Sequence, residues 1–387
     1  MNTVRRLIYK EVASAIALVA LGFLALFFFF DLVDELQDIG KSLGIAGVAA
    51  AEQSYQLRHA LLYVALLIPN HLYELLPISV LIGTIFVMAR LAQSSEYTIL
   101  RTSGLGPWRA LQLLLTIGGV FVVLSFLVGD YLAPPSSRAA QLVKAKFRGD
   151  LTVGQTGAWL KEKQRYNAYV ANVKTLSPDN TMSNVKIYEF DNKGLITSIT
   201  QAGSATFKPD DSWLLSNVTR DDFLIASAAG SSAPTAATSE TSSIKRSTLA
   251  TLRWPTELTE EMVSVALLKP ERMGTVDLFN YVRHLDNNGQ TAQRYEIEFW
   301  RKVFYPLSCL VMVILALPFA YLHFRAGGIS AYVFAGVMIG ISFFLLNNVF
   351  GYIGNLRDWK PWIAAATPGL LYALASLGAF GWLVLRR

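Results

Sequence analysis

Long apolar runs without formal charge alternate with charged segments along the chain. Five runs contain 19 residues or more, enough to cross about 30 Å of hydrocarbon at the 1.5 Å rise of an α-helix. They are residues 12–30, 110–129, 303–324, 326–356 and 361–385. A sixth apolar segment, residues 61–89, is interrupted by one formal charge, Glu74, which we place near a membrane interface, where a carboxylate is tolerated. The pattern predicts six transmembrane helices.

The segment between the third and fourth of these helices has a different pattern. Four stretches alternate partly between apolar and polar residues and are rich in Val, Ile, Thr, Tyr and Phe: residues 166–176, 184–191, 195–209 and 212–224. The turn-forming sequences SPDN, DNKG and PDDS separate them. Short strands at this spacing predict an antiparallel sandwich or jelly roll. Residues 226–243 contain almost no bulky apolar side chain and are predicted to form a loop within this domain.

Two further helices are predicted between the strands and the fourth span. Residues 277–285 favour a short helix that ends at the sequence Asn287–Asn288–Gly289. A second helix is expected to begin near Thr291 and to continue into the fourth span. The chain then divides into residues 1–132 with spans one to three, a β domain at 133–270, and residues 271–387 with the helical connection and spans four to six.

The composition supports a membrane protein, and the charges indicate its orientation. Of 387 residues, 53% are hydrophobic and 16% charged, and the mean hydropathy is +0.38, whereas soluble domains carry about 25% charged residues. Basic residues precede the first span and follow the second, fourth and sixth, so they share one side when the spans alternate. That side is predicted to be cytoplasmic and to hold both termini, with the β domain on the other side. The first apolar run is longer than a signal-peptide core of about 7–15 residues, so we expect it to remain as an anchor.

The sequence contains no familiar catalytic or nucleotide-binding motif. It has no G-x-x-x-x-G-K-[ST], H-E-x-x-H or G-x-S-x-G sequence, and its four histidines follow no metal-ligand spacing. The single cysteine, Cys309, falls within the fourth span, so no disulfide is expected in the β domain. We therefore expect a non-catalytic chain with no metal site and no bound nucleic acid. An ion-coupled carrier is disfavoured because formal charge is absent from five of the six spans; Glu74 is interpreted as interfacial or as paired with a partner subunit.

The turn between the second and third spans, LAQSSEYTILRTSGLG, is longer and more charged than a simple connection requires. A serine can cap the N-terminus of a helix here, a carboxylate in the first turn suits the helix dipole, and a glycine can end the helix. The residues that carry this pattern are Ser95, Glu96, Tyr97, Arg101 and Gly104. The pattern predicts a short helix near residues 93–103. It is either a capped surface helix or one that docks into a cytoplasmic partner with Glu96 as a charged anchor.

Basic and aromatic residues toward the opposite membrane interface also have two interpretations each. The basic residues are Arg138, Arg301 and Lys302, and the aromatic residues are Phe27, Phe30 and Phe343. The bases either form a solvated, snorkelling face or contact phosphate groups in the outer leaflet. The aromatics either face lipid and neighbouring helices or line a cavity for acyl chains.

Four longer stretches together resemble one family. They are VDELQDIGK after span one, IPNHLYELLPISVLIGTIFVMARLAQSSEYTILRTSGL through span two and its turn, GDYLAPPSSRAA after span three, and LDNNGQTAQRYEIEFWRKVFYPLSCLVMVILALPFAYLHFRAGG around span four. With these stretches the chain resembles the lipopolysaccharide-export permeases (LptF/LptG), and the LptG branch more than the LptF branch. The resemblance covers nearly the whole length.

The resemblance implies an integral membrane α-helical protein of the inner membrane of a Gram-negative bacterium, with six transmembrane helices and an inserted periplasmic all-β jelly-roll domain. It implies a permease subunit of an ABC transporter that extracts lipopolysaccharide from the outer leaflet and passes it to the periplasmic bridge protein LptA. The implied partners are the sister permease LptF, the ATPase dimer LptB, which binds ATP and Mg, and LptC; this chain itself would hold no cofactor. In the family the glutamate of the SE turn meets the ATPase, which gives that role to Glu96. Spans one, two and five line the cavity, which favours the cavity interpretation of Phe27, Phe30 and Phe343.

One departure from the family concerns phosphate recognition. Some members place lysines at the outer end of span one, where this chain has Asp31 and Asp38, and Lys41 is the first base. Recognition of lipid A phosphates would then fall to Lys41, Arg301, Lys302 or the sister subunit. The alternative function is a membrane-anchored periplasmic assembly or scaffold protein without transport activity, which no ATPase would accompany.

Overall fold

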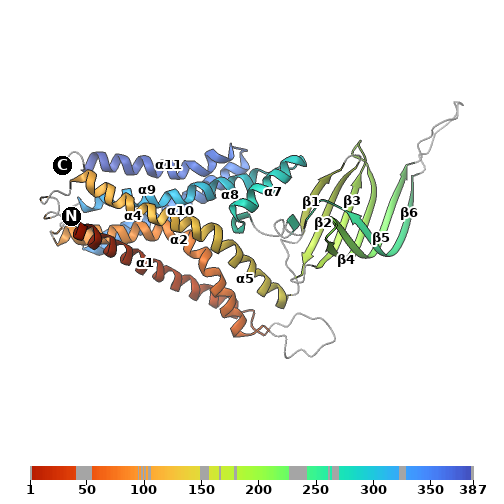
Figure 1. Ribbon diagram of the computed structural model, residues 1–387, viewed down its shortest axis with the longest axis horizontal. Helices are drawn as coiled ribbons and strands as arrows, with labels where there is room; N and C mark the ends of the chain where they lie inside the picture. Colours follow the sequence, from red (N-terminus) through yellow and green to blue (C-terminus); the bar gives the residue numbers. More distant parts are fainter. Residues whose placement is uncertain are drawn as a thin grey trace.

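The computed structural model describes residues 2–40, 55–94, 96, 99, 102, 106–148, 157–164, 167–177, 181–225, 242–259, 262–263, 270–321 and 328–384. Two regions are visible along its length, a bundle of long helices and a curved β-sheet (Figure 1). Helices α5 and α7 lie between them, at the end of the bundle that we call the sheet-side end.

Among the described residues, six helical segments are long and apolar enough to cross a membrane, which confirms the predicted number. They are built from α1 (Asn2–Leu36); α2 (Leu57–Gln93); α4 (Pro107–Leu127), η1 (Val128–Leu132) and α5 (Ala133–Arg148); α8 (Gln293–Phe304), η3 (Tyr305–Leu307), α9 (Ser308–Ala316) and η4 (Leu317–Ala320); α10 (Ile329–Leu356); and α11 (Pro361–Ala379) with η5 (Phe380–Val384).

The third span continues beyond the predicted domain boundary at residue 133, because α5 adds sixteen residues to the helix. Pro134 and Pro135 have no backbone N–H to donate within a helix. Immediately before them, η1 is a π-helical turn in which Ala133 N–H donates to Val128 O, five residues back. Such a turn lets the helix continue where the normal hydrogen-bond ladder is interrupted. The first described strand begins at Ala158.

Helix α2 occupies the centre of the bundle and α1 lies on its outside. The bundle core joins α2, α4 and α9 through fully buried side chains such as Leu81, Leu114 and Met312. In the apolar stretch of α1 only 6% of the residues are buried, against 78% in α2. Helix α1 thus packs on α2 with one side and leaves its other sides exposed.

The described strands form a single antiparallel sheet in chain order. They are β1 (Ala158–Lys163), β2 (Ala168–Leu176), β3 (Thr181–Phe190), β4 (Ile196–Lys208), β5 (Ser212–Ile225) and β6 (Ser242–Pro255). The inserted all-β region is confirmed, and β2 to β5 match the four predicted strands. Strands β1 and β6 were not predicted, and the described strands make one curved sheet (Figure 1) where two facing sheets were expected. Ser242 and Ser243 belong to β6; the rest of the predicted 226–243 loop lies outside the described residues.

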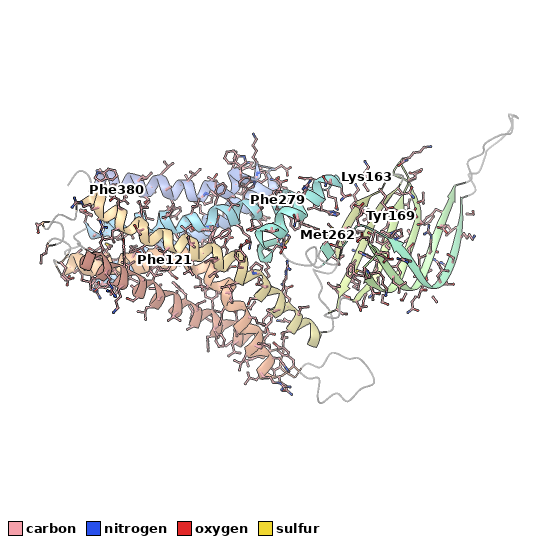
Figure 2. The ribbon with its side chains drawn as sticks, viewed as in Figure 1. Phe121, Lys163, Tyr169, Met262, Phe279 and Phe380 are labelled. Carbon is pink, nitrogen blue, oxygen red and sulfur yellow. The ribbon has the colours of Figure 1, made fainter. Side chains whose placement is uncertain are left out.

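Helix α7 (Thr275–Asn287), which follows the short turn η2 (Pro270–Arg272), packs against the sheet. Its residues Leu278, Tyr281 and Leu285 belong to the same buried cluster as the sheet residues. Asn288 ends the helix and Gly289 follows with φ +62°, as the Asn-Asn-Gly sequence predicted. The sheet and the helical connection therefore share one core. Figure 2 shows Lys163 beside α7 and Tyr169 within the sheet, whereas Phe121 and Phe380 lie in the bundle.

Candidate functional site

Helices α1 and α10 both pack on α2 and leave much of their own apolar surface exposed. Glycines permit the close approach: Gly83 of α2 lies against the backbone of Ile16 in α1, and Gly340 of α10 lies against Ile78 of α2. The exposed apolar side chains on α1 and α10 include Leu18, Leu21, Phe29, Phe30, Phe334, Met338 and Leu345. We call the exposed apolar surface of these two helices, together with α2 on which both pack, the α1–α2–α10 face; its side chains can contact lipid chains or other membrane helices.

The three predicted aromatic residues occupy different environments. Phe30 is 56% exposed on α1. Phe27 is partly exposed, and its ring lies 5.0 Å from that of His71 on α2. Phe343 is only 3% exposed and packs against Tyr305 and Tyr372. Within this chain, Phe27 and Phe30 are therefore accessible to an acyl chain and Phe343 is not.

Carboxylates at the acidic sheet-side end of α1 bind residues of the same chain. Asp31 lies 2.7 Å from His71 Nε2. Glu35, which is almost fully buried, accepts hydrogen bonds from Tyr55 Oη at 2.8 Å and from Lys144 Nζ of α5 at 2.7 Å. Burial and the hydrogen bond to Glu35 raise the pKa of Tyr55 far above its usual value, so the phenol remains a donor. These carboxylates fix α1 to α2 and α5; Lys41 lies outside the described residues.

We expect the variant Lys144→Met to lower the free energy of unfolding by about 2 kcal/mol, because it leaves the buried Glu35 carboxylate without its cationic donor. The double variant Glu35→Gln, Lys144→Met is expected to recover part of this loss. Chemical denaturation of the detergent-solubilised protein measures both, with Lys174→Met on the exposed side of β2 as the control. Equal unfolding midpoints for Lys144→Met and the control would contradict the pairing.

Of the four predicted phosphate-contacting bases, the three that the structure describes all bind acceptors within this chain. Arg138 pairs with Asp277 of α7. Arg301 donates to Glu298 Oε1 at 2.8 Å and to the carbonyl of Asn347 at 2.6 Å. Lys302 is 8% exposed and donates to a backbone carbonyl of the third span at 3.1 Å. Each base carries more N–H donors than these bonds use, so a phosphate would share the base with its present partner or displace that partner.

Arg301 and Lys302 line a cavity of about 140 Å³ between α2, α8 and α10, whose wall combines polar and aromatic side chains. Its wall also includes Asn70, Tyr73, Glu74, Glu298, Asn347 and Asn348. Glu74 accepts a hydrogen bond from Asn70 Nδ2 at 2.8 Å, so this carboxylate is paired within its own helix. Sequence reasoning missed the cavity; the signal that pointed to it was Asn347–Asn348, a polar pair in the middle of an uncharged apolar run.

The predicted coupling segment is described only in part. Glu96, Ile99 and Thr102 are helical and exposed, and their spacing of three places them on one face. Thr102 Oγ1 donates to Ile99 O at 2.9 Å. Ser95, Tyr97, Arg101 and Gly104 lie outside the described residues. The segment joins α2 to α4 at the end of the bundle away from the sheet.

Comparison with known proteins identifies the family. Residues 6–386 match the sequence profile of the family described as "Lipopolysaccharide export system permease LptF/LptG". The chain belongs to the LptF/LptG family. It is similar to the lipopolysaccharide export system permease protein LptG of Escherichia coli strain K12, with 28% identity over 341 residues, 87% of this chain and 88% of that protein. It is also similar to the LptG of Haemophilus influenzae, with 24% identity over 380 residues, 96% of each chain. This LptF/LptG member is thus a multi-pass membrane permease of the lipopolysaccharide export system.

Proposed function

We propose that this chain is the permease subunit of an ABC transporter in the inner membrane that moves lipopolysaccharide out of the outer leaflet. The observation that carries the proposal is the family match across residues 6–386 in a chain whose α1–α2–α10 face is apolar and unpartnered. Both termini would be cytoplasmic and the sheet periplasmic, in keeping with the basic residues on one side. The sheet would then receive the lipid and pass it to LptA.

The energy would come from a separate ATPase. The sequence has no phosphate-binding loop of its own, so ATP and Mg would be bound by a partner, LptB, and no cofactor by this chain. Glu96 would contact that partner, with Ser95, Tyr97, Arg101 and Gly104 shaping the same helix. LptF and LptC would complete the membrane assembly. Closure of the ATPase would move the second and third spans through the connecting helix.

The lipid would lie against the α1–α2–α10 face. Phe27 and Phe30 are accessible there for acyl chains, and Phe343 would support the face from inside. Lys41 is the base that we propose for the phosphates, while Arg138, Arg301 and Lys302 would contribute through donors that the partners described above leave free, or by exchanging those partners.

The test is purification of the tagged full-length chain from its native membrane in a mild detergent, followed by reconstitution with lipopolysaccharide in vesicles. We expect a P-loop ATPase to copurify, and lipopolysaccharide to reach added LptA when ATP is supplied but not when a non-hydrolysable analogue replaces it. A chain that brings down no ATPase and shows no ATP-dependent transfer would instead support the assembly or scaffold function.

A further inference from the structure

The N-terminus of α7 is capped by a residue from another helix. The residue before α7 is Gly274, which has no side chain to accept from the free N–H groups of the first turn. Asp130, in the π-helical turn of the third span, accepts instead: its Oδ1 lies 2.6 Å from Thr275 N. The cap is thus supplied by a residue 145 positions earlier in the chain.

The residue before Asp130, Gly129, contacts both the second and the fourth span. At Gly129 an added Cβ would overlap the ring of Tyr73 in α2, so the third span is held close to the second. The carbonyl of Gly129 would normally accept from Ala133, but Ala133 donates to Val128 and the following residue is a proline. Lys302 of α8 donates to this carbonyl at 3.1 Å. Spans two, three and four therefore meet at the cap.

A second contact joins the same two helices. Arg138 lies eight residues after Asp130 on the same side of the third span and pairs with Asp277 in the first turn of α7. Asp277 Oδ2 is also 3.3 Å from Gly274 N, so this carboxylate supports the helix start from within. The third span thus holds the first turn of α7 at two points.

The rest of α7 is fixed to the sheet. Leu278 and the preceding Met273 are fully buried in the core that α7 shares with the strands. At the other end of the helix, Asn288 Oδ1 accepts from Lys163 N of β1 at 2.9 Å. Helix α7 also packs on α8, where the ring of Tyr281 lies 4.7 Å from that of Tyr295. A change in the angle between α7 and these two spans would therefore change the orientation of the sheet.

We propose that Asp130 is a positioning residue for lipid transfer, because its cap on α7 links the orientation of the β domain to the third span. When the spans rearrange, the cap and the Arg138–Asp277 pair turn the sheet with them. The transfer role rests on the proposed function; the link between span and sheet does not.

The experiment measures this link directly in the full-length protein. Cys309 is the only native cysteine, so Cys309→Ala gives a background without thiols. Cysteines that carry spin labels then replace Lys193, in the exposed β3–β4 turn, and Lys360, at the exposed sheet-side end of α11. Pulsed electron resonance is expected to give a narrow distance distribution in this background. We expect Asp130→Ala to broaden it and Asp130→Asn to keep it narrow, because asparagine caps as well as aspartate.

In the reconstituted complex, Asp130→Ala is expected to reduce the amount of lipopolysaccharide delivered per ATP hydrolysed about fivefold. This factor corresponds to the loss of one helix cap of about 1 kcal/mol. The rate of ATP hydrolysis is expected to stay unchanged. The proposal would be overturned if Asp130→Ala kept the narrow distance distribution of the background protein, or if Asp130→Asn broadened the distribution as much as Asp130→Ala does. Absence of transfer in the wild type would count against the proposed function alone, since the distances still report the cap.

A second pair of variants covers the case in which Asp130→Ala does not fold. Arg138→Asp is expected to broaden the same distribution, and Arg138→Asp combined with Asp277→Arg to narrow it again. If the double variant gave a distance distribution as broad as that of Arg138→Asp, the proposed link would be overturned, because the ion pair would then have no part in orienting the sheet.

Discussion

Replacing Glu96 with lysine is expected to remove the ATPase from the purified complex and to stop ATP-dependent transfer. Glu96 is an exposed carboxylate on a helical segment at the end of the bundle away from the sheet. Reversing a charge that meets a partner's cation costs about 2–5 kcal/mol, which weakens binding by at least about 30-fold. A pull-down from the native membrane, wild type beside Glu96→Lys, measures the loss.

The matched control is Lys360→Glu, which reverses an exposed charge at the sheet-side end of the bundle and should leave the ATPase bound. Glu96→Gln is expected to fall between wild type and Glu96→Lys, because it removes the charge without reversing it. Full ATPase recovery with Glu96→Lys would remove the coupling role from this residue, and the segment would then be a capped surface turn.

Replacing Gly83 with alanine is expected to separate α1 from α2. A Cβ at this position would lie 2.7 Å from the backbone N and Cα of Ile16, and backbone atoms cannot move aside as a flexible side chain can. Overpacking of this kind costs about 1–3 kcal/mol. The effect should fall on α1 because this helix is held to the bundle mainly by its packing on α2. A fall in melting temperature of the solubilised protein, together with faster proteolysis of α1, would show it.

Gly22→Ala is the control for this prediction, because Gly22 lies on α1 itself and has open space around its added Cβ. Alanine there should be neutral or slightly stabilising, since it also favours the helix. If the Gly83→Ala and Gly22→Ala proteins have the same melting temperature, α1 does not lie on α2 as described.

The elements governed by local pattern were predictable from sequence. An uncharged run of sufficient length has few alternatives to a membrane helix, and alternating apolar positions gave β2 to β5. Strand β6 was missed because its residues, SSIKRSTLATLRWP, are largely polar and exposed; pairing with β5 rather than its own composition makes it a strand. The extension of the third span was missed because Pro134 and Pro135 normally end a helix.

The partners of the charged side chains were not predictable. Lys144 and Glu35 are 109 residues apart, and Arg138 and Asp277 are 139 residues apart. Nothing in a local pattern says that these ends meet, because their meeting depends on how the helices pack. For that reason, bases that looked available for phosphates are found beside carboxylates of the same chain. The coupling role of Glu96 came from the family resemblance and stays a prediction.

The contact between Asp130 and Thr275 also closes the β domain into a loop whose two ends touch. Strands β1 to β6 lie between these two residues in the chain, and α5 alone of the described helices between them continues along the bundle. The third span and α7 are therefore already neighbours at this contact, independently of the strands. A domain inserted in this way can be lengthened, exchanged or lost during evolution without any change in the path of the chain through the membrane.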